Sequence, residues 1–100
     1  MLNLSHNRIE RLEGLKHLDQ LVYLDMSSNK LSELDVEASL PGRINIIKLN
    51  DNPIETEDPD YRKKCVVGLQ WLTEMDKIKV VAAERMVYLG LMPPSRFNVK

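Results

Sequence analysis

The chain has 100 residues, of which 43% are hydrophobic and 29% are charged, and its 14 basic and 15 acidic side chains leave a net charge of −1. This composition fits one small folded domain, and it argues against a disordered chain and against a protein that holds nucleic-acid phosphates on a positive face. No apolar run approaches the roughly 18 residues that a bilayer-spanning helix needs, so no membrane partner is expected.

A pattern of apolar residues and one asparagine recurs three times in the first half of the chain. The asparagines are 22 and then 23 residues apart (29 − 7 and 52 − 29). The three copies read Leu2-x-Leu4-x-x-Asn7-x-Ile9, Leu24-x-Met26-x-x-Asn29-x-Leu31 and Ile47-x-Leu49-x-x-Asn52-x-Ile54. This frame resembles the L-x-x-L-x-L-x-x-N-x-L signature of leucine-rich repeats, in which each repeat forms one coil with a short parallel strand.

Asn7, Asn29 and Asn52 follow the predicted strands, at the point where the chain must turn sharply. A sharp turn separates backbone groups from their strand partners, and buried polar groups need hydrogen bonds. The asparagine amide both donates and accepts hydrogen bonds on a short stem. We therefore predict a structural ladder, in which these side chains bond the turn backbone of their own and neighbouring coils.

The segments between the strands form the predicted convex side of the coils. In the first repeat, apolar residues fall at positions 9, 12, 15, 18 and 21, and this period of three predicts tight 3₁₀-like turns rather than an α-helix. In the second repeat, residues 34–40 predict about one helical turn, which Pro41 and Gly42 end.

Residues 7–25 make the resemblance more specific, through the order Asn7-x-Ile9-x-x-Leu12-Glu13-Gly14-Leu15-x-x-Leu18-x-x-Leu21-x-x-Leu24-Asp25. This order resembles the repeat class, about 22 residues long, of a nuclear regulatory subunit of protein phosphatase, a light chain of axonemal dynein and a protein subunit of a splicing ribonucleoprotein. The resemblance extends to about residue 81. It implies an α/β leucine-rich-repeat solenoid, with parallel strands on the concave face, a short 3₁₀ or helical convex side, and a helical C-terminal cap.

This frame predicts three segments. Leucine-rich repeats occupy residues 1–54, with the first repeat truncated; a C-terminal cap occupies residues 55–81; and a terminal helix with a loose tail occupies residues 82–100. Met1 aligns with Tyr23, so the leading leucine of the first repeat is missing. We therefore expect the tail end of a longer array or a product of truncation, whose bare first strand would self-associate.

The predicted cap begins with an acidic loop over residues 55–57. Asp58 suits the N-cap position of a helix, and Pro59 suits its first turn. Apolar residues then recur at spacings of four, four and three, which predicts one buried helical stripe. The stripe consists of Tyr61, Cys65, Leu69 and Leu72.

A final short strand is predicted to end at Met75 and Asp76. The order from Pro59 through this strand resembles the C-terminal capping motif of the same repeat class. It departs from that motif at Gln70, where proline is usual, and at Met75, where leucine is usual. The basic residues 62–64 fall largely off the buried stripe and are predicted to be a solvated helix face rather than a nucleic-acid contact.

A second helix is predicted over residues 78–89, because apolar residues recur there at helical spacing. Gly90 and the pair Pro93-Pro94 end it, and residues 93–100 are predicted to be loose. The stripe that we expect this helix to bury consists of Ile78, Ala82, Met86 and Leu89.

Residues for catalysis or metal binding do not gather into a pattern. His6 and His17 lack a second ligand at metal spacing. Cys65, the only cysteine, excludes an internal disulfide, and it reads as a buried filler on the cap stripe rather than a nucleophile. We predict no catalytic residue, no metal, no cofactor and no small-molecule substrate. The unpaired thiol favours a reducing compartment, and hence an intracellular protein, cytoplasmic or nuclear.

The predicted binding residues are the strand side chains that flank the buried ones, because these project onto the concave face. Tyr23 and Ile46 pair an exposed aromatic with an exposed aliphatic side chain, a composition typical of protein-binding hot spots. Trp71 is a further candidate, which either binds a partner or packs against the cap helix. The full set is Asn3, Ser5, Tyr23, Asp25, Ser27, Ile46, Lys48, Asn50, Trp71 and Glu74, with Asp76 beside it.

The resemblance implies a non-catalytic adaptor or regulatory subunit that holds a partner protein on its concave face, in the cytoplasm, the nucleus, or the cilium or cytoskeleton. The alternative is a subunit of a ribonucleoprotein, associated with RNA through a protein partner. A strongly basic tail would favour that alternative, and Arg96 with Lys100 supplies little of one.

Overall fold

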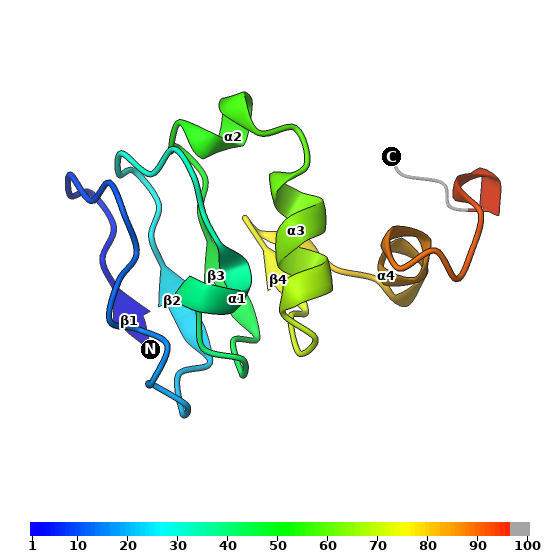
Figure 1. The fold of residues 1–100 in the computed structure, drawn as a ribbon, viewed down its shortest axis with the longest axis horizontal. Coiled ribbons are helices and arrows are strands. Elements are labelled where there is room, and N and C mark those ends of the chain that lie inside the picture. The colour runs from blue at the N-terminus through cyan, green and yellow to red at the C-terminus, as the bar shows by residue number, and fades with distance from the viewer. Residues whose placement is uncertain (97–100) are drawn as a thin grey trace.

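The structure is a computed structural model and describes residues 1–96. Within that range, one sheet contains its strands in chain order (Figure 1): β1 (Leu2–Asn3), β2 (Tyr23–Asp25), β3 (Ile46–Lys48), β4 (Glu74–Met75) and β5 (Ile78–Lys79). The first four strands are parallel, and β5 turns back antiparallel against β4. The stacked parallel strands confirm the predicted α/β solenoid.

Each central strand points one apolar side chain into the core. Leu24, Ile47 and Met75 stand in register across β2, β3 and β4, and all three are fully buried. Full burial of such a side chain contributes about 1.5–3 kcal/mol, so strands this short are stable as a stack rather than singly. The segments between and beyond these strands add to the same core Leu12, Leu31, Val36, Leu40, Ile44, Leu49, Val66 and Leu69.

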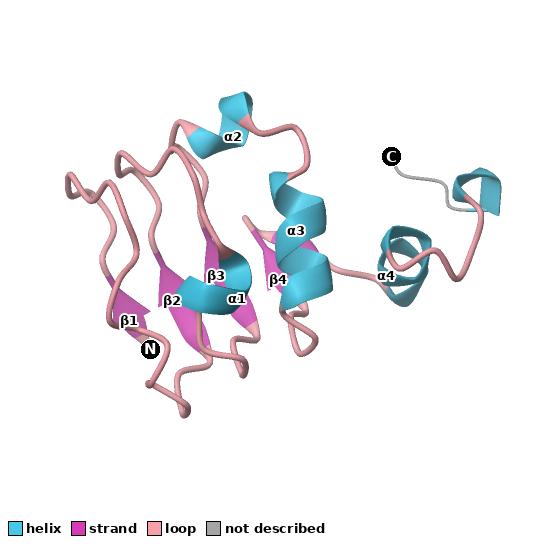
Figure 2. Ribbon diagram, viewed as in Figure 1, coloured by secondary structure: helices cyan, strands magenta, loops and turns pink. Residues whose placement is uncertain are grey.

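The convex side changes from one coil to the next (Figure 2). In the first coil, the Leu18 N–H donates to the Leu15 carbonyl and the Leu21 N–H to the Leu18 carbonyl, which gives the tight turns that the period of three predicts. In the second coil, α1 (Val36–Ser39) forms the predicted helical turn. The Asp35 carboxylate caps α1 by accepting a backbone N–H.

The acidic segment after the third coil is a short helix, α2 (Ile54–Glu57), where the sequence predicted a loop. Ile54 is buried and anchors its first turn, and the carboxylates of Glu55 and Glu57 suit the positive end of a helix. The burial of Ile54 and the favourable position of these carboxylates therefore stabilise a helix despite the loop-like composition of residues 55–57.

The main cap helix, α3 (Tyr61–Gly68), begins two residues later than predicted, with Asp60 at its N-cap. The Asp58 carboxylate does not cap the helix directly. It accepts the Asp60 N–H (3.0 Å) and the Lys64 ammonium (2.7 Å), so it fixes the turn that precedes α3. The predicted stripe is buried at Cys65, Leu69 and Leu72 and half-buried at Tyr61.

The end of the chain departs most from the prediction. Residues 78–79 form strand β5, and helix α4 begins only at Ala82 and ends at Tyr88. The expected buried stripe is largely in solvent, with Ile78 62% exposed, Met86 38% and Leu89 48%. Helix α4 instead turns Glu84 towards the cap, because polar contacts rather than apolar spacing orient it.

Gly90 ends α4 in the left-handed conformation, as predicted, with a φ of 76°. A 3₁₀ helix follows at Pro94–Arg96, inside the predicted loose tail. Residues 97–100 of that tail, including Lys100, lie outside the described residues. Over residues 1–96, no helix is long and apolar enough to cross a membrane.

Candidate protein-binding surface

The strand register arranges the predicted binding residues in two rows. Tyr23, Ile46 and Glu74 form one row across β2, β3 and β4, and Asn3, Asp25 and Lys48 form the other across β1, β2 and β3. Since Leu24 and Ile47 between the rows point into the core, the rows point away from it. We call this surface the outer sheet face; it comprises Asn3, Ser5, Tyr23, Asp25, Ser27, Ile46, Lys48, Asn50 and Glu74.

Tyr23, Ile46 and Lys48 form the centre of the outer sheet face. All three are half-buried, and the Lys48 ammonium lies 5.8 Å from the centroid of the Tyr23 ring, within cation–π range. The Tyr23 hydroxyl is the main group that raises the pKa of Lys48, and the Asp25 and Glu74 carboxylates raise it further. The raised pKa means that Lys48 carries its charge at neutral pH beside the aromatic ring.

Other members of the outer sheet face bond one another. The Asp25 carboxylate accepts the Ser27 N–H (3.0 Å) and the Ser27 hydroxyl (2.7 Å), and the Asn3 amide accepts the same two groups of Ser5. Burial acts to raise the pKa of Asp25, but the two Ser27 bonds and the charge of Lys48 lower it overall. These four side chains shape the turns that follow β1 and β2. Because they already bond one another, they have less hydrogen-bonding capacity left for a partner.

Asn50 differs from its counterparts Ser5 and Ser27. Its side-chain oxygen is buried and lacks a hydrogen-bond partner within residues 1–96. A buried acceptor without a donor costs about 1–3 kcal/mol. The Asn50 oxygen is therefore an unsatisfied acceptor inside the fold and not a group that the outer sheet face offers to a partner.

The asparagine ladder holds the coils together beneath this face. The Asn52 amide donates to the carbonyls of Leu49 (2.9 Å) and Met26 (2.9 Å), and its oxygen accepts the Leu31 N–H (3.0 Å). Asn29 makes the matching bonds to its own coil and to the first, whereas Asn7 is exposed and bonds within its own turn. We call each ladder asparagine a rung. The two inner rungs, Asn29 and Asn52, thus each join two coils through one amide.

The residue before each rung is in the left-handed conformation, although none of the three is glycine. The φ angles are 59° at His6, 58° at Ser28 and 60° at Asp51. Such a conformation is costly for most side chains, and here the rung bonds to the turn backbone hold it. His6 therefore has a structural position in a turn.

Asp76 ends the ladder in a different way. Its carboxylate accepts the backbone N–H groups of Leu49 (2.7 Å) and Asn50 (3.0 Å), and it also accepts the Tyr61 hydroxyl. Burial and this bond to Asp76 raise the pKa of Tyr61, which keeps the phenol protonated as a donor. A cap side chain thus satisfies the last coil where another strand would otherwise lie.

A polar clamp, which sequence reasoning missed, joins α4 to the cap. It comprises Arg62, Glu84, Arg85 and Tyr88. The Arg62 guanidinium donates to both oxygens of Glu84 (2.5 and 2.9 Å), and the Tyr88 hydroxyl donates to Glu84 as well (3.0 Å). Arg85 donates to the carbonyls of Val66, at the end of α3, and of Leu69 and Leu72, which follow it.

The clamp corrects the prediction that residues 62–64 form a solvated face. Lys63 and Lys64 are exposed, but Arg62 is half-buried and also donates to the Met75 and Lys79 carbonyls. Burial acts to raise the pKa of Glu84, yet the bonds from Arg62 and Tyr88 lower it overall. Arg62 and Glu84 are 22 residues apart in the sequence, so no local pattern of spacing predicts that they pair.

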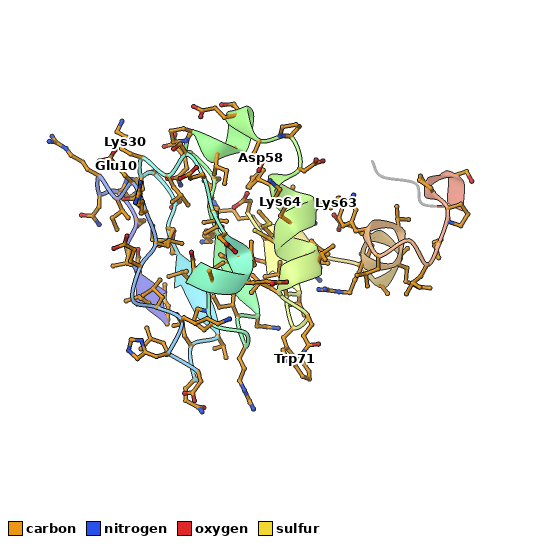
Figure 3. The ribbon with its side chains drawn as sticks, in the orientation of Figure 1. Glu10, Lys30, Asp58, Lys63, Lys64 and Trp71 are labelled. Atoms are coloured by element: carbon orange, nitrogen blue, oxygen red, sulfur yellow. The ribbon has the colours of Figure 1, made fainter. Side chains whose placement is uncertain are left out.

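Trp71 and Cys65 have opposite environments. Trp71 follows α3 in the loop before β4, and 60% of its surface is exposed, so it is not packed away against the cap helix. It projects from the body of the molecule (Figure 3). Cys65 is buried, and this burial raises the pKa of its thiol to about 12, which suits a core side chain rather than a nucleophile.

Together, the stacked coils, the ladder and the cap define a repeat solenoid that presents an open strand face. Residues 1–42 match the family described as Leucine Rich repeats (2 copies). Over 80 residues the chain is 38% identical to Leucine-rich repeat-containing protein 23 of Xenopus tropicalis, which covers 76% of this chain and 22% of that protein. The chain belongs to the leucine-rich-repeat family, as the sequence predicted.

Two further comparisons extend this similarity. Over 77 residues the chain is 34% identical to Dynein axonemal assembly factor 1 of Homo sapiens, which covers 74% of this chain and 10% of that protein. A chain in the crystal structure of the Drosophila melanogaster SNF/U2A′ complex has the same fold, with a TM-score of 0.55 at 20% identity, over 88% of this chain and 65% of that one. This chain therefore spans a tenth to about a fifth of these two curated relatives.

Proposed function

We propose that the chain is a non-catalytic interaction module that binds a partner protein on its outer sheet face. The observation that carries this proposal is the register of Tyr23 with Ile46, which sets an aromatic and an aliphatic side chain side by side on an open sheet. Aromatic anchors ringed by polar groups dominate the energy of protein interfaces. In a solenoid, the strand side is the concave, binding side.

The Lys48 ammonium lies over the Tyr23 ring at the centre of this face. This contact favours the arrangement of both side chains in the free chain, which reduces the freedom that they lose on binding. We expect a partner that covers Tyr23 and Ile46 with an apolar side chain.

The relatives support a setting for this module. One of them is named as an assembly factor for axonemal dynein, so we place the module inside the cell, in the cytoplasm of ciliated cells, as an adaptor or regulatory subunit. The ribonucleoprotein alternative rests on a similarity of fold at 20% identity, and the net charge of −1 gives it no further support.

The test replaces the centre of the face while leaving the core intact. The variant Tyr23→Ala, Ile46→Ala, Lys48→Glu is compared with a convex-side control, Lys63→Glu, Val67→Ala, whose side chains are exposed on α3. Both are checked by circular dichroism and used as bait in lysate of ciliated cells. Loss of a captured protein in the sheet variant alone supports the proposal, and its retention by both variants contradicts it.

A further inference from the structure

An exposed apolar patch surrounds Trp71 at the end of the sheet where the strands begin. Val22 comes directly before β2, and Trp71 comes shortly before β4. A hollow of about 360 Å³ between them is lined by Val22, Arg43, Asn45 and Trp71. We call Val22, Arg43, Trp71, Val81 and Met86 the Trp71 patch.

The other side of the indole borders a second hollow, of about 380 Å³, beneath the start of α4. Val81 and Met86 line it, and they are 49% and 38% exposed. Met86 belongs to the stripe that the sequence predicted to be buried and that the polar clamp leaves in solvent, and Val81 comes directly before α4. Trp71 therefore stands as a ridge between two partly apolar depressions.

The backbone beneath the patch is held firmly. The Asn45 side chain donates to the Trp71 carbonyl (2.9 Å), the Thr73 N–H donates to the Asn45 carbonyl (2.8 Å), and the Asn45 N–H donates to the Val22 carbonyl (2.8 Å). A surface that is fixed in advance loses little conformational entropy on binding. The exposed indole is thus presented on a rigid base.

The charges around the patch are of one sign. Arg43 lines the first hollow and Arg85 the second, and among the described residues that line either hollow none is acidic. This positive character stands out in a chain whose net charge is −1. A guanidinium beside an exposed indole suits a carboxylate next to an apolar side chain.

We propose that the Trp71 patch is a second docking surface, which binds a short acidic, apolar segment of a partner protein. An apolar side chain of that segment covers Trp71 and enters a hollow beside it, while a neighbouring carboxylate pairs with Arg43. A second copy of this chain fits less well, because a symmetric contact through the patch would bring its positive sides together. The patch is separate from the outer sheet face, so the two surfaces can be tested independently.

Trp71 is the only tryptophan in the chain, so its fluorescence reports on the patch directly. The probes are two short helical peptides with the same leucines, one with glutamates and one with lysines at the other positions. The glutamate peptide is expected to shift the emission of Trp71 to shorter wavelength and to protect it from acrylamide quenching. The lysine peptide is expected to leave both unchanged.

Variants then assign the binding to named residues. Arg43→Glu and Trp71→Ala are each expected to weaken binding of the labelled glutamate peptide about tenfold or more, read by anisotropy. The matched control Lys30→Glu makes the same charge change at an exposed site away from the patch and should bind normally. The Tyr23→Ala, Ile46→Ala, Lys48→Glu variant should also bind normally, which separates this proposal from the proposed function.

Three results would overturn the proposal. Equal affinity for the glutamate and lysine peptides would show that charge plays no part. No spectral shift with the glutamate peptide up to about 1 mM, the level of the weakest interactions, would show that the patch does not bind this chemistry. A shift that follows protein concentration without peptide would assign the patch to a second copy of the chain.

Discussion

The repeat coils and the cap satisfy the same backbone groups with different chemistry. Between coils, strand N–H groups meet main-chain carbonyls: Met26 donates to Lys48 (2.8 Å), and Leu4 donates to Asp25 (2.8 Å). At the last coil, the Leu49 N–H meets the carboxylate of Asp76 instead (2.7 Å). A side chain therefore takes the place of the carbonyl that a further strand would supply.

The difference between an amide and a carboxylate explains why the coils can repeat and why the array ends at the cap. An asparagine amide donates and accepts, so each inner rung can bond its own coil and the one before it. An ionised carboxylate only accepts hydrogen bonds. Asp76 therefore satisfies the last coil but has no side-chain N–H to donate to another one. The coils depend on neutral amides and buried leucines, whereas the cap adds charged pairs. Acid should therefore act on the cap before it acts on the coils.

The largest expected effect is in the coils. Leu24→Ala removes a fully buried side chain at the centre of the stack and is expected to lower the free energy of unfolding by about 2–5 kcal/mol, because it leaves a cavity. Urea melts monitored by circular dichroism measure the loss. A melt unchanged from the wild type would contradict the core position of Leu24.

Arg62→Ala tests the cap in the same way. It leaves Glu84, which is 5% exposed, without its ion-pair partner, and breaking a buried pair from one side costs about 3 kcal/mol. Hydrogen exchange should show the loss first in α4. The control is Lys63→Ala, an exposed neighbour on α3, and an equal effect of both variants would show that the clamp is not what holds α4.

Asn29→Ala compares an inner rung of the ladder with an outer one. It unpairs turn backbone in two coils and is expected to cost about 1–3 kcal/mol. Asn7→Ala removes bonds that lie in solvent and should cost about 0.5 kcal/mol or less. Equal losses in denaturant melts of the two variants would mean that the ladder gives no more stability between coils than within one.

The smallest effect is the pH dependence of the clamp. Folding lowers the pKa of Glu84 below its ordinary value of 4.5, so its stabilising contribution is complete above that pH and is lost as the pH falls further. Glu84→Gln should be less stable than the wild type at neutral pH, and the gap should narrow under acid. Melting temperatures across this range measure the gap, and a constant gap would exclude Glu84 as the titrating group.

The sequence predicted the features that repeat. Three copies of one frame place Leu24, Ile47 and the ladder asparagines, since a fixed period leaves little choice of which side chains face inward. The apolar spacing after Tyr61 likewise predicted the burial of Cys65, Leu69 and Leu72, although α3 ends at Gly68 and the last two residues follow the helix. In these regions hydrophobic burial decides the structure, and burial leaves a period in the sequence.

The sequence did not predict the features that depend on single distant pairs. Helix α4 carries an apolar stripe, but the pairing of Arg62 with Glu84 turns that stripe outward, and the partners are too far apart to form a pattern. The outer sheet face was located by the alternation of strand side chains. That Asp25 bonds Ser27 and that Asn50 has an unused acceptor became visible only in the fold.

The direction of the ladder bonds has a consequence for how such a protein can change in length. Asn52 bonds its own coil and the coil before it, so a rung is complete as soon as its predecessor exists. A duplication of one whole coil of 22 or 23 residues, the spacing between the asparagines, would carry its own rung and leave the bonds of Asp76 untouched. A duplication of any other length would break the frame, so whole coils are the natural step of gene growth and of protein engineering in this architecture.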